Sequence, residues 1–287
     1  MSTTLKREWH IAGRCLLIGE RTLVMGVLNV TPDSFSDGSQ FLTPEMALEH
    51  AEQMIAEGAD IIDVGGESTR PGAALVSLEE ELKRVAPVVN ELSKGTNVPI
   101  SIDTTKAAVA RAALDAGAAI VNDVSGLRFD FHIADEAAKS GAGLVLMHSR
   151  GTPATMQRLP PVADIMEEIT SSLRSSIAMA ERRGVKRESI VVDPGIGFGK
   201  SHDQNIELIA KLDQLASAFP DLPILVGSSR KSFIGRILDN APVTDRLHGT
   251  MASIAAAVLR GAHIVRVHDV KAAVETVRVA DAIKWAS

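Results

Sequence analysis

The sequence contains no tyrosine, one cysteine and few aromatic residues, which make up only 3% of its 287 positions. The single cysteine, Cys15, excludes an intramolecular disulfide framework and a zinc site built from several cysteines. The net charge of −6 and the scarcity of aromatic rings argue against nucleic-acid binding, which normally needs a basic face and often stacking rings. We therefore expect a protein of the reducing cytoplasm that binds no nucleic acid.

Long apolar runs are also missing. The longest, near residues 251–259, is far shorter than the roughly 18 residues that suggest a membrane span, so no membrane association is expected. Residues 1–9 mix acidic and basic side chains and do not resemble a signal peptide. The content of 45% hydrophobic and 23% charged residues is typical of a globular protein. A small anionic ligand remains possible, because local basic side chains can overcome a mildly negative surface.

Short β-branched runs alternate with longer amphipathic patterns, which favours a parallel sheet covered by helices. The predicted strands are Leu23–Asn29, Asp60–Val64, Val98–Asp103, Ala119–Asn122, Gly143–Met147, Ile190–Asp193, Ile224–Gly227 and His263–Val267. The predicted helices include Pro44–Glu57, Leu78–Leu92, Lys106–Ala116, Ile165–Arg183 and Gln204–Ala218. Eight βα units predict an α/β fold of the TIM (β/α)8 barrel type. A doubly wound sheet is the alternative, but no Gly-rich dinucleotide turn follows the first strand.

The organisation of the chain indicates a single domain. Residues 1–21 form an N-terminal extension, and residues 22–287 form the barrel. Within the extension, Trp9–Ile11 and Leu16–Ile18 flank Ala12-Gly13-Arg14 and predict a small hairpin that closes the bottom of the barrel. No linker, low-complexity tract or block of like charge divides the sequence.

Polar residues follow the predicted strands. They are Asn29, Glu67-Ser68-Thr69-Arg70, Asp103, Asn122, His148, Asp193, Ser229-Arg230-Lys231-Ser232, Arg266 and His268. Each of these residues alone could have a purely structural role, because an Asp or Asn after a strand is often the N-cap of the next helix. In a barrel, however, the carboxyl ends of all strands meet at one mouth, where active sites lie. Their convergence therefore favours a functional site.

Two chemical groups can be separated among these residues. The set Asp103, Asn122, Asp193 and Lys231 suits a flat heterocycle with alternating donors and acceptors. The set Arg70, Arg230, Arg266, His268 and Asn29 suits an anion, with or without a divalent metal. The alternative for Arg266 and His268 is a surface salt bridge to Asp269 or Glu275. Asn29–Gly38 and Gly65–Ala73 have the composition of lid loops, and Asp193–Lys200 lacks the spacing of a Walker A motif.

Five motifs of the sequence match a known family in order and at barrel spacing. They are residues 25–38 (MGVLNVTPDSFSDG), 65–72 (GGESTRPG), 193–200 (DPGIGFGK), 229–232 (SRKS) and 266–268 (RVH). The sequence resembles the dihydropteroate synthases, pterin-binding enzymes of the folate pathway that are targets of sulfonamides. The resemblance covers residues 22–287, nearly the whole chain. The chain departs from the usual family pattern at Ser149, Ala107 and Ser228, none of which is an implied site residue.

The resemblance implies a reaction and a set of site residues. The family condenses 6-hydroxymethyl-7,8-dihydropterin diphosphate with 4-aminobenzoate to give 7,8-dihydropteroate and diphosphate, and it suggests a homodimer. The implied pterin-binding residues are Asp103, Asn122, Val124, Met147, Asp193, Gly227, Lys231 and Arg266. The implied diphosphate ligands are Asn29, Thr69, Arg266 and His268, and Asn29 also ligates Mg²⁺. The implied aminobenzoate site consists of Phe35, Thr69, Arg70, Pro71, Phe198, Lys231 and Ser232, and the implied catalytic residues are Asp103, Arg70 and Lys231.

The chemistry of the residues agrees with a dissociative displacement. Diphosphate leaves readily once cations neutralise its charge. The dihydropterin can delocalise the positive charge left on its methylene carbon, and a nearby carboxylate such as Asp103 would stabilise that charge. The aromatic amine needs no strong base, and the sequence offers no obvious nucleophile–base pair.

Three other functions remain open from the sequence. A methyltetrahydrofolate–corrinoid methyltransferase shares the pterin-binding set but has no use for the anion cluster at Arg266 and His268. A Schiff-base aldolase would use Lys231. A non-catalytic pterin-binding protein is the third, although decay of an enzyme would be expected to remove a lid or anion residue first.

Overall fold

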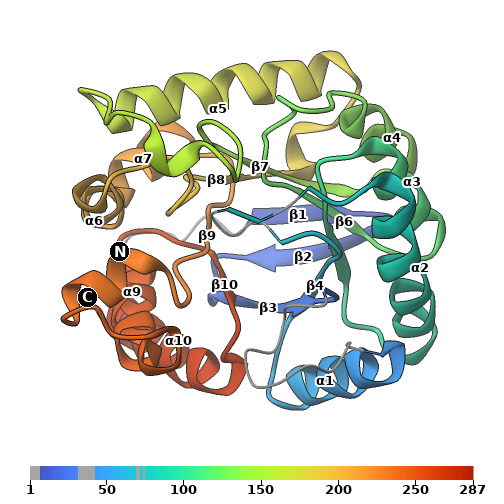
Figure 1. Cartoon of the computed structure of the whole chain (residues 1–287), viewed down its shortest axis with the longest axis horizontal. Coiled ribbons are helices and arrows are strands. Elements are labelled where there is room, and N and C mark those ends of the chain that lie inside the picture. Colours follow the sequence, from blue (N-terminus) through green and yellow to red (C-terminus); the bar gives the residue numbers. More distant parts are fainter. Residues whose placement is uncertain (1–6, 32–42, 69–71, 74, 287) are drawn as a thin grey trace.

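A parallel β-barrel surrounded by helices forms the body of the chain, as a computed structural model shows for residues 7–31, 43–68, 72–73 and 75–286 (Figure 1). The barrel strands are β3 (Leu23–Asn29), β4 (Ile61–Gly65), β5 (Ile100–Asp103), β6 (Ile120–Asp123), β7 (Gly143–Met147), β8 (Ile190–Asp193), β9 (Leu225–Val226) and β10 (Ile264–Val267). Within the described residues these eight strands lie in the order β8-β7-β6-β5-β4-β3-β10-β9. A parallel bridge between Val192 and Ile224 joins the two edges. The predicted TIM barrel is confirmed, and the doubly wound alternative is wrong.

Helices follow the strands and cover the outside of the barrel. They are α1 (Pro44–Ala56), α2 (Leu78–Gly95), α3 (Ala107–Asp115), α4 (Ile133–Ser140), α5 (Ile165–Arg182), α6 (His202–Ala210), α7 (Leu212–Ala218), α8 (Ser232–Ile237), α9 (Leu247–Leu259) and α10 (Val270–Trp285), with 3-10 turns η1 (Met156–Arg158), η2 (Arg187–Ser189) and η3 (Val243–Asp245). The Ser77 hydroxyl caps α2 by accepting from the Glu80 N–H. Gly141, with a positive φ of 68°, ends α4 in the left-handed conformation that favours glycine.

One predicted helix is wrong, because Gln204–Ala218 is divided into α6 and α7. The break lies at Lys211, whose φ of −111° and ψ of 20° leave the helical range. Leu208 before the break and Leu212 after it are both buried, so core packing overrides the continuous helical pattern. The predicted strands lie within one or two residues of their observed bounds.

The N-terminal hairpin consists of β1 (Arg7–Ile11) and β2 (Arg14–Ile18). Its turn contains two residues, Ala12 with a φ of 42° and Gly13 with a φ of 76°, and the prediction that Arg14 belongs to the turn is wrong. Positive φ at both central residues is the pattern of a type I′ turn, whose twist matches that of the flanking strands.

The inward face of the hairpin fills the bottom of the barrel. Trp9, Ile11 and Ile18 are fully buried and share a core cluster with residues from the barrel strands. Gly143 at the start of β7 makes room for this plug, since a Cβ there would lie 2.6 Å from the Ile11 Cγ2 atom. Figure 1 shows the two strands crossing the middle of the ring of helices. In the described part of the chain, no helix combines the length and apolar character needed to cross a membrane.

Candidate active site

One row of residues crosses four neighbouring strands at the carboxyl-terminal rim of the barrel. The sheet register pairs Asn29 with Gly65, Gly65 with Asp103, and Asp103 with Asn122. Because paired residues of parallel strands share a face, these side chains project to the same side of the sheet. Gly65 opens a gap in the row, since a Cβ there would lie 3.6 Å from the Asp103 Cβ and 3.8 Å from the Asn29 Oδ1.

Arg266 of β10 connects to this row through two carboxylates. Its Nε donates to the Asp63 Oδ2 at 2.6 Å, and its Nη2 donates to the Asp103 Oδ2 at 2.7 Å. The alternative of a surface salt bridge from Arg266 to Asp269 or Glu275 is therefore wrong. Asp269 binds Arg230 instead, with 2.9 Å between the Arg230 Nε and the Asp269 Oδ2.

Asp63 is a site residue that the sequence analysis missed. It lies on β4, two residues before Gly65 on the same face, and is fully buried. Its Oδ2 also accepts from the Asn122 Nδ2 at 3.0 Å, whereas its Oδ1 has no hydrogen-bond partner among the described residues. The sequence did contain a signal for Asp63, which is a carboxylate inside an otherwise apolar strand. A charge buried in this way needs hydrogen-bonding or charged partners, so its position indicates an interaction inside the barrel.

Asp193 ends β8 on the other side of the barrel, paired in register with Met147. Its Oδ1 accepts from the Gly195 N–H at 2.7 Å. The loop that follows is pressed against the site: a Cβ on Gly195 would lie 1.9 Å from the His148 carbonyl oxygen, and one on Gly197 would lie 2.9 Å from the Lys231 Cδ. With φ values of 68° and 87°, Gly195 and Gly197 also adopt a backbone that favours glycine.

Lys231 lies directly before α8 and faces the same glycine loop. Its Nζ donates to the Ile196 carbonyl and lies 4.4 Å from the centre of the Phe198 ring. Ser232, the first residue of α8, is exposed next to it. Three predicted aminobenzoate-site residues, Phe198, Lys231 and Ser232, are thus brought together.

Burial controls the charges of the site. It raises the pKa of Asp103 to about 7 against the pull of Arg266, and Asp63 adds to the rise. It lowers the pKa of Lys231 to about 8, although Asp193 opposes this shift. Burial also raises the pKa of Asp193, opposed by the Gly195 N–H and by Lys231. Such shifts in a cluster of converging side chains are characteristic of functional sites.

Other predicted positions surround this cluster. Val124 follows β6, Met147 ends β7, and Gly227 is buried directly after β9. His268 follows β10, and its Nδ1 lies 3.0 Å from the Ser229 Oγ. Four predicted positions, Phe35, Thr69, Arg70 and Pro71, lie outside the described residues.

A partly buried ion-pair cluster, which the sequence analysis did not identify, lies at the base of the second predicted lid. The Lys106 Nζ lies 2.5 Å from both the Glu67 Oε2 and the Glu81 Oε2. Thr104 donates to the other oxygen of Glu81 at 2.7 Å. This cluster connects the segment after β4 to the start of α3 and so fixes where the second loop leaves the barrel.

Comparison with known proteins identifies the family to which this chain belongs. The model of the pterin binding enzyme family matches residues 25–268. A dihydropteroate synthase of Synechocystis is 49% identical over 265 residues, covering 92% of this chain and 91% of the relative. The structure of a Yersinia pestis dihydropteroate synthase in a sulfonamide drug complex has a TM-score of 0.91 and 42% identity, and covers 98% of this chain and 100% of that chain. That of a Burkholderia cenocepacia dihydropteroate synthase complexed with 7,8-dihydropteroate has a TM-score of 0.87 and 43% identity, and covers 99% of both chains. The chain belongs to the dihydropteroate synthase family of pterin-binding enzymes.

Proposed function

We propose that this protein condenses 6-hydroxymethyl-7,8-dihydropterin diphosphate with 4-aminobenzoate, giving 7,8-dihydropteroate and diphosphate. The observation that carries the proposal is the convergence of buried Asp103, Asn122 and Asp193 with Lys231 and Arg266 at one end of the barrel. A Burkholderia relative of the same fold is complexed with the product, 7,8-dihydropteroate.

The pterin ring fits the donors and acceptors of this cluster. Asp193 would accept hydrogen bonds from the amino group and a ring N–H, while Asn122 and Asp103 would hold the opposite edge. Lys231 would donate to the pterin carbonyl, and Arg266 would lie against the ring face. Val124, Met147 and Gly227 would complete the walls of the pterin pocket.

The aminobenzoate would bind next to the pterin, between Phe198, Lys231 and Ser232. Support comes from the position of the Lys231 Nζ over the Phe198 ring and of Ser232 at the start of α8. Phe35, Thr69, Arg70 and Pro71 would complete this pocket. We propose sulfonamides as competitors of aminobenzoate here, since the Yersinia relative forms a sulfonamide drug complex.

The diphosphate would lie at the rim, held by Asn29, Thr69, Arg266 and His268. The side-chain oxygen of Asn29 is a hard donor of the kind that Mg²⁺ prefers, and it faces the gap at Gly65. Within the described residues, no group of three His, Cys, Asp or Glu ligands lies at this rim. The donor set therefore fits Mg²⁺ bound through one protein oxygen together with diphosphate oxygens and water. The ion would neutralise charge on the leaving group.

Charge on the transferred carbon dominates the proposed displacement. The bond from the pterin methylene carbon to the diphosphate oxygen breaks first, and both electrons leave with diphosphate. The ionised carboxylate of Asp103 stabilises the positive charge that spreads over the pterin, and Arg70 and Lys231 orient the two substrates. The amine nitrogen then bonds to the methylene carbon and loses one proton to solvent. No protein group needs to act as a strong base, because the aromatic amine is neutral near pH 7.

We also propose a homodimer of the cytoplasm that pairs through α9 and α10. Val279 and Ile283 of α10 are 62% and 58% exposed, which is high for large apolar side chains. They line a cavity of about 600 Å³ with Met251 and Ala255 of α9. Sedimentation of the wild type and of Val279→Glu tests the proposal: a dimer that the charge dissociates supports it, and a wild-type monomer contradicts it.

Diphosphate release tests the reaction. It is measured from the pterin diphosphate with Mg²⁺, with and without 4-aminobenzoate, for the wild type and for Asn29→Ala. Release that rises with aminobenzoate and collapses in the variant supports the synthase and the metal ligand. Tight pterin binding without release would indicate a methyltransferase or a binding protein instead, and absence of pterin binding would contradict the roles given to Asp103, Asn122 and Asp193.

A further inference from the structure

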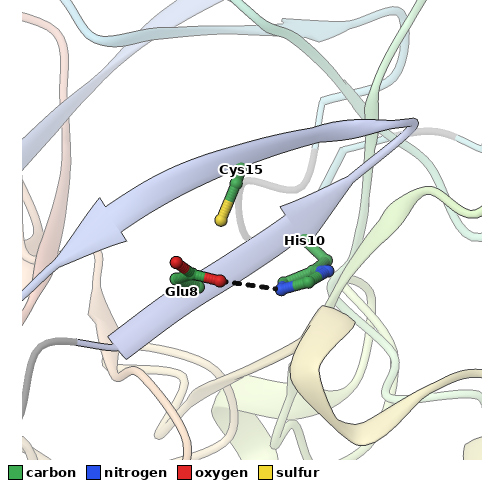
Figure 2. A group of neighbouring side chains, drawn as sticks. All are labelled: Glu8, His10 and Cys15. Atoms are coloured by element: carbon green, nitrogen blue, oxygen red, sulfur yellow. Dashed lines mark ion pairs between the residues drawn. The ribbon is translucent and has the colours of Figure 1, made fainter.

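The outward face of the β1–β2 hairpin carries three different metal-binding side chains. Glu8 and His10 are two residues apart on β1, so they share the face opposite to buried Trp9. Cys15 of β2 is the direct cross-strand partner of His10 and therefore lies on the same face. Figure 2 shows the thiol of Cys15 pointing from one strand towards Glu8 and His10 on the other.

The distances within this trio are close to those of a coordination sphere. One ligand atom of each side chain lies within 4.8 Å of the other two, and the Glu8 Oε2 is 3.4 Å from the His10 Nε2. Ligands at the usual zinc distances stand about 3.4–3.7 Å apart in a tetrahedron. Closing the trio around an ion requires shifts of about an ångström, and the side chains of Glu8 and His10 are 59% and 43% exposed and able to move.

A fourth residue occupies the position expected of a supporting carboxylate. The Glu188 Oε1 lies 3.9 Å from the His10 Nδ1, the ring nitrogen opposite the one that faces Glu8. Metal-bound histidines usually donate their second ring N–H to a carboxylate or carbonyl, which fixes the orientation of the ring. Glu188 belongs to η2, and η2 is tied to the hairpin by a 2.9 Å hydrogen bond from the Trp9 Nε1 to the Ser189 carbonyl.

We infer that Glu8, His10 and Cys15 form a binding site for a borderline-soft divalent cation of the Zn²⁺ class, at the end of the barrel opposite the proposed active site. A mixed set of sulfur, nitrogen and oxygen donors suits Zn²⁺ and disfavours Mg²⁺. The fourth position is left to water, for which a cavity of about 390 Å³ bordered by His10 and Cys15 gives room. The guanidinium of the nearby Arg14 is hydrogen-bonded elsewhere, since its Nη1 donates to the Asn97 carbonyl at 3.0 Å.

Binding replaces one bond of the thiol. The S–H bond of Cys15 breaks, a bond from sulfur to the ion forms, and one proton is released to solvent. Affinity for the ion should therefore increase with pH.

The bound ion would fasten the plug of the barrel. Its ligands come from both strands of the hairpin, and Glu188 extends the connection to η2 directly before β8. Because Trp9 and Ile11 seal the bottom of the barrel, an ion bound only to the folded hairpin raises the midpoint of thermal unfolding.

Cobalt titration of untagged, chelator-treated protein tests the inference. Co²⁺ reports a thiolate ligand by sulfur-to-metal charge transfer in the near ultraviolet. We expect one equivalent of Co²⁺ to produce this band, Zn²⁺ to displace it, and excess Mg²⁺ to leave it unchanged. Cys15→Ser should abolish the band. His10→Gln and Glu8→Gln should weaken Co²⁺ binding strongly, and Glu188→Gln should weaken it about 10-fold.

Two matched variants keep the result specific. His132→Gln removes an exposed histidine that pairs with Asp135 at 2.8 Å and does not belong to the trio of Glu8, His10 and Cys15. This variant should bind Co²⁺ as the wild type does. Asn29→Ala, at the proposed active site, should do the same. Absence of the charge-transfer band, or a band of equal affinity in His10→Gln and Glu8→Gln, overturns the site. All substituted ligands lie on the outward face of the hairpin, so the variants should remain folded. A lost charge-transfer band then reports the loss of a ligand.

Discussion

The Nε of Arg266 lies 2.6 Å from the Oδ2 of Asp63, a carboxylate that no solvent reaches. The same oxygen accepts from the Asn122 side chain, and the other arm of Arg266 binds Asp103. Burial alone would lower the pKa of Arg266, but Asp63 and Asp103 outweigh it and raise that pKa. Asp63 is therefore the common partner that fixes Arg266 and Asn122, two side chains proposed to touch the pterin.

Replacing Asp63 by Asn removes this charge with little change of volume. We expect the free energy of unfolding to fall by about 3 kcal/mol, because the largely buried Arg266 is left with one charged partner fewer. Affinity for the pterin substrate should fall as well, since Asn122 and Arg266 lose the group that orients them. Urea unfolding and calorimetric titration with the pterin measure the two effects.

A surface ion pair supplies the control. Asp135 binds Arg183 at 2.6 Å, and its side chain is 41% exposed, so Asp135→Asn should change the free energy of unfolding by less than about 1 kcal/mol. If Asp63→Asn is as stable as this control and binds the pterin like the wild type, Asp63 has no positioning role.

The pH dependence of kcat/KM should be bell-shaped with a narrow optimum. Burial raises the pKa of Asp103 to about 7, so activity should rise through this pH as the carboxylate becomes able to stabilise positive charge. Burial lowers the pKa of Lys231 to about 8, so activity should fall above this pH as the amine loses the proton that it donates to the pterin. Steady-state kinetics from about pH 5 to about pH 10 measure both limbs.

Two substitutions test which residue causes each limb of the pH profile of kcat/KM. Lys231→Arg keeps a positive charge at alkaline pH and should move the descending limb upward, although the different shape of the guanidinium lowers the maximum. Asp103→Asn should remove the ascending limb together with most of the activity. An alkaline limb at the same pH in Lys231→Arg would show that another group controls it.

The barrel could be predicted because its strands are buried on both faces. Runs such as Ile61-Ile62 and Leu144–Leu146 are apolar throughout, and that signal depends only on local sequence. The break at Lys211 could not be predicted in the same way. Both α6 and α7 are helical by propensity, and the position of the break follows from how Leu208 and Leu212 pack in the finished core.

The site residues at the carboxyl ends of the strands could be predicted from the sequence, whereas Asp63 inside β4 could not. Asn29, Asp103 and Asp193 end their strands, and Asn122 is the last residue but one of β6. The topology of a barrel brings strand ends together wherever the register falls. Asp63 lies two residues deeper, and its role depends on which residue of β10 reaches across to it. The contact between Asp63 and Arg266 depends on the three-dimensional closure of the barrel and cannot be inferred from local sequence.

Lys200 should anchor the loop that carries Phe198. Its buried Nζ donates to the carbonyls of His148 at 3.2 Å, Gly195 at 2.7 Å and Phe198 at 3.1 Å, which connects the segments after β7 and β8. Lys200→Met leaves these three carbonyls without their donor, so the free energy of unfolding should fall by about 3 kcal/mol or more. Since the loop of Phe198 loosens, KM for aminobenzoate should rise more than kcat falls.

The matched control is Lys211→Met. The Lys211 Nζ binds Glu207 at 2.7 Å at the break between α6 and α7, where both side chains are exposed, so its loss should leave the free energy of unfolding nearly unchanged. Chemical unfolding and steady-state kinetics compare the two variants. An unchanged KM for aminobenzoate in Lys200→Met would leave Lys200 with a purely structural role.

His148 should make the protein sensitive to acid. It is buried behind the site, and among the described residues its Nδ1 has no hydrogen-bond partner. Burial, reinforced by Lys200, lowers its pKa to about 2, whereas an unfolded chain titrates near pH 6.5. Between these values the unfolded state binds more protons, so stability falls as pH falls, by about 1.4 kcal/mol for each pH unit. His148→Gln should lack this contribution. Unfolding measured from about pH 8 to about pH 5 should therefore show a shallower loss of stability in the variant, and equal slopes would mean that His148 titrates normally.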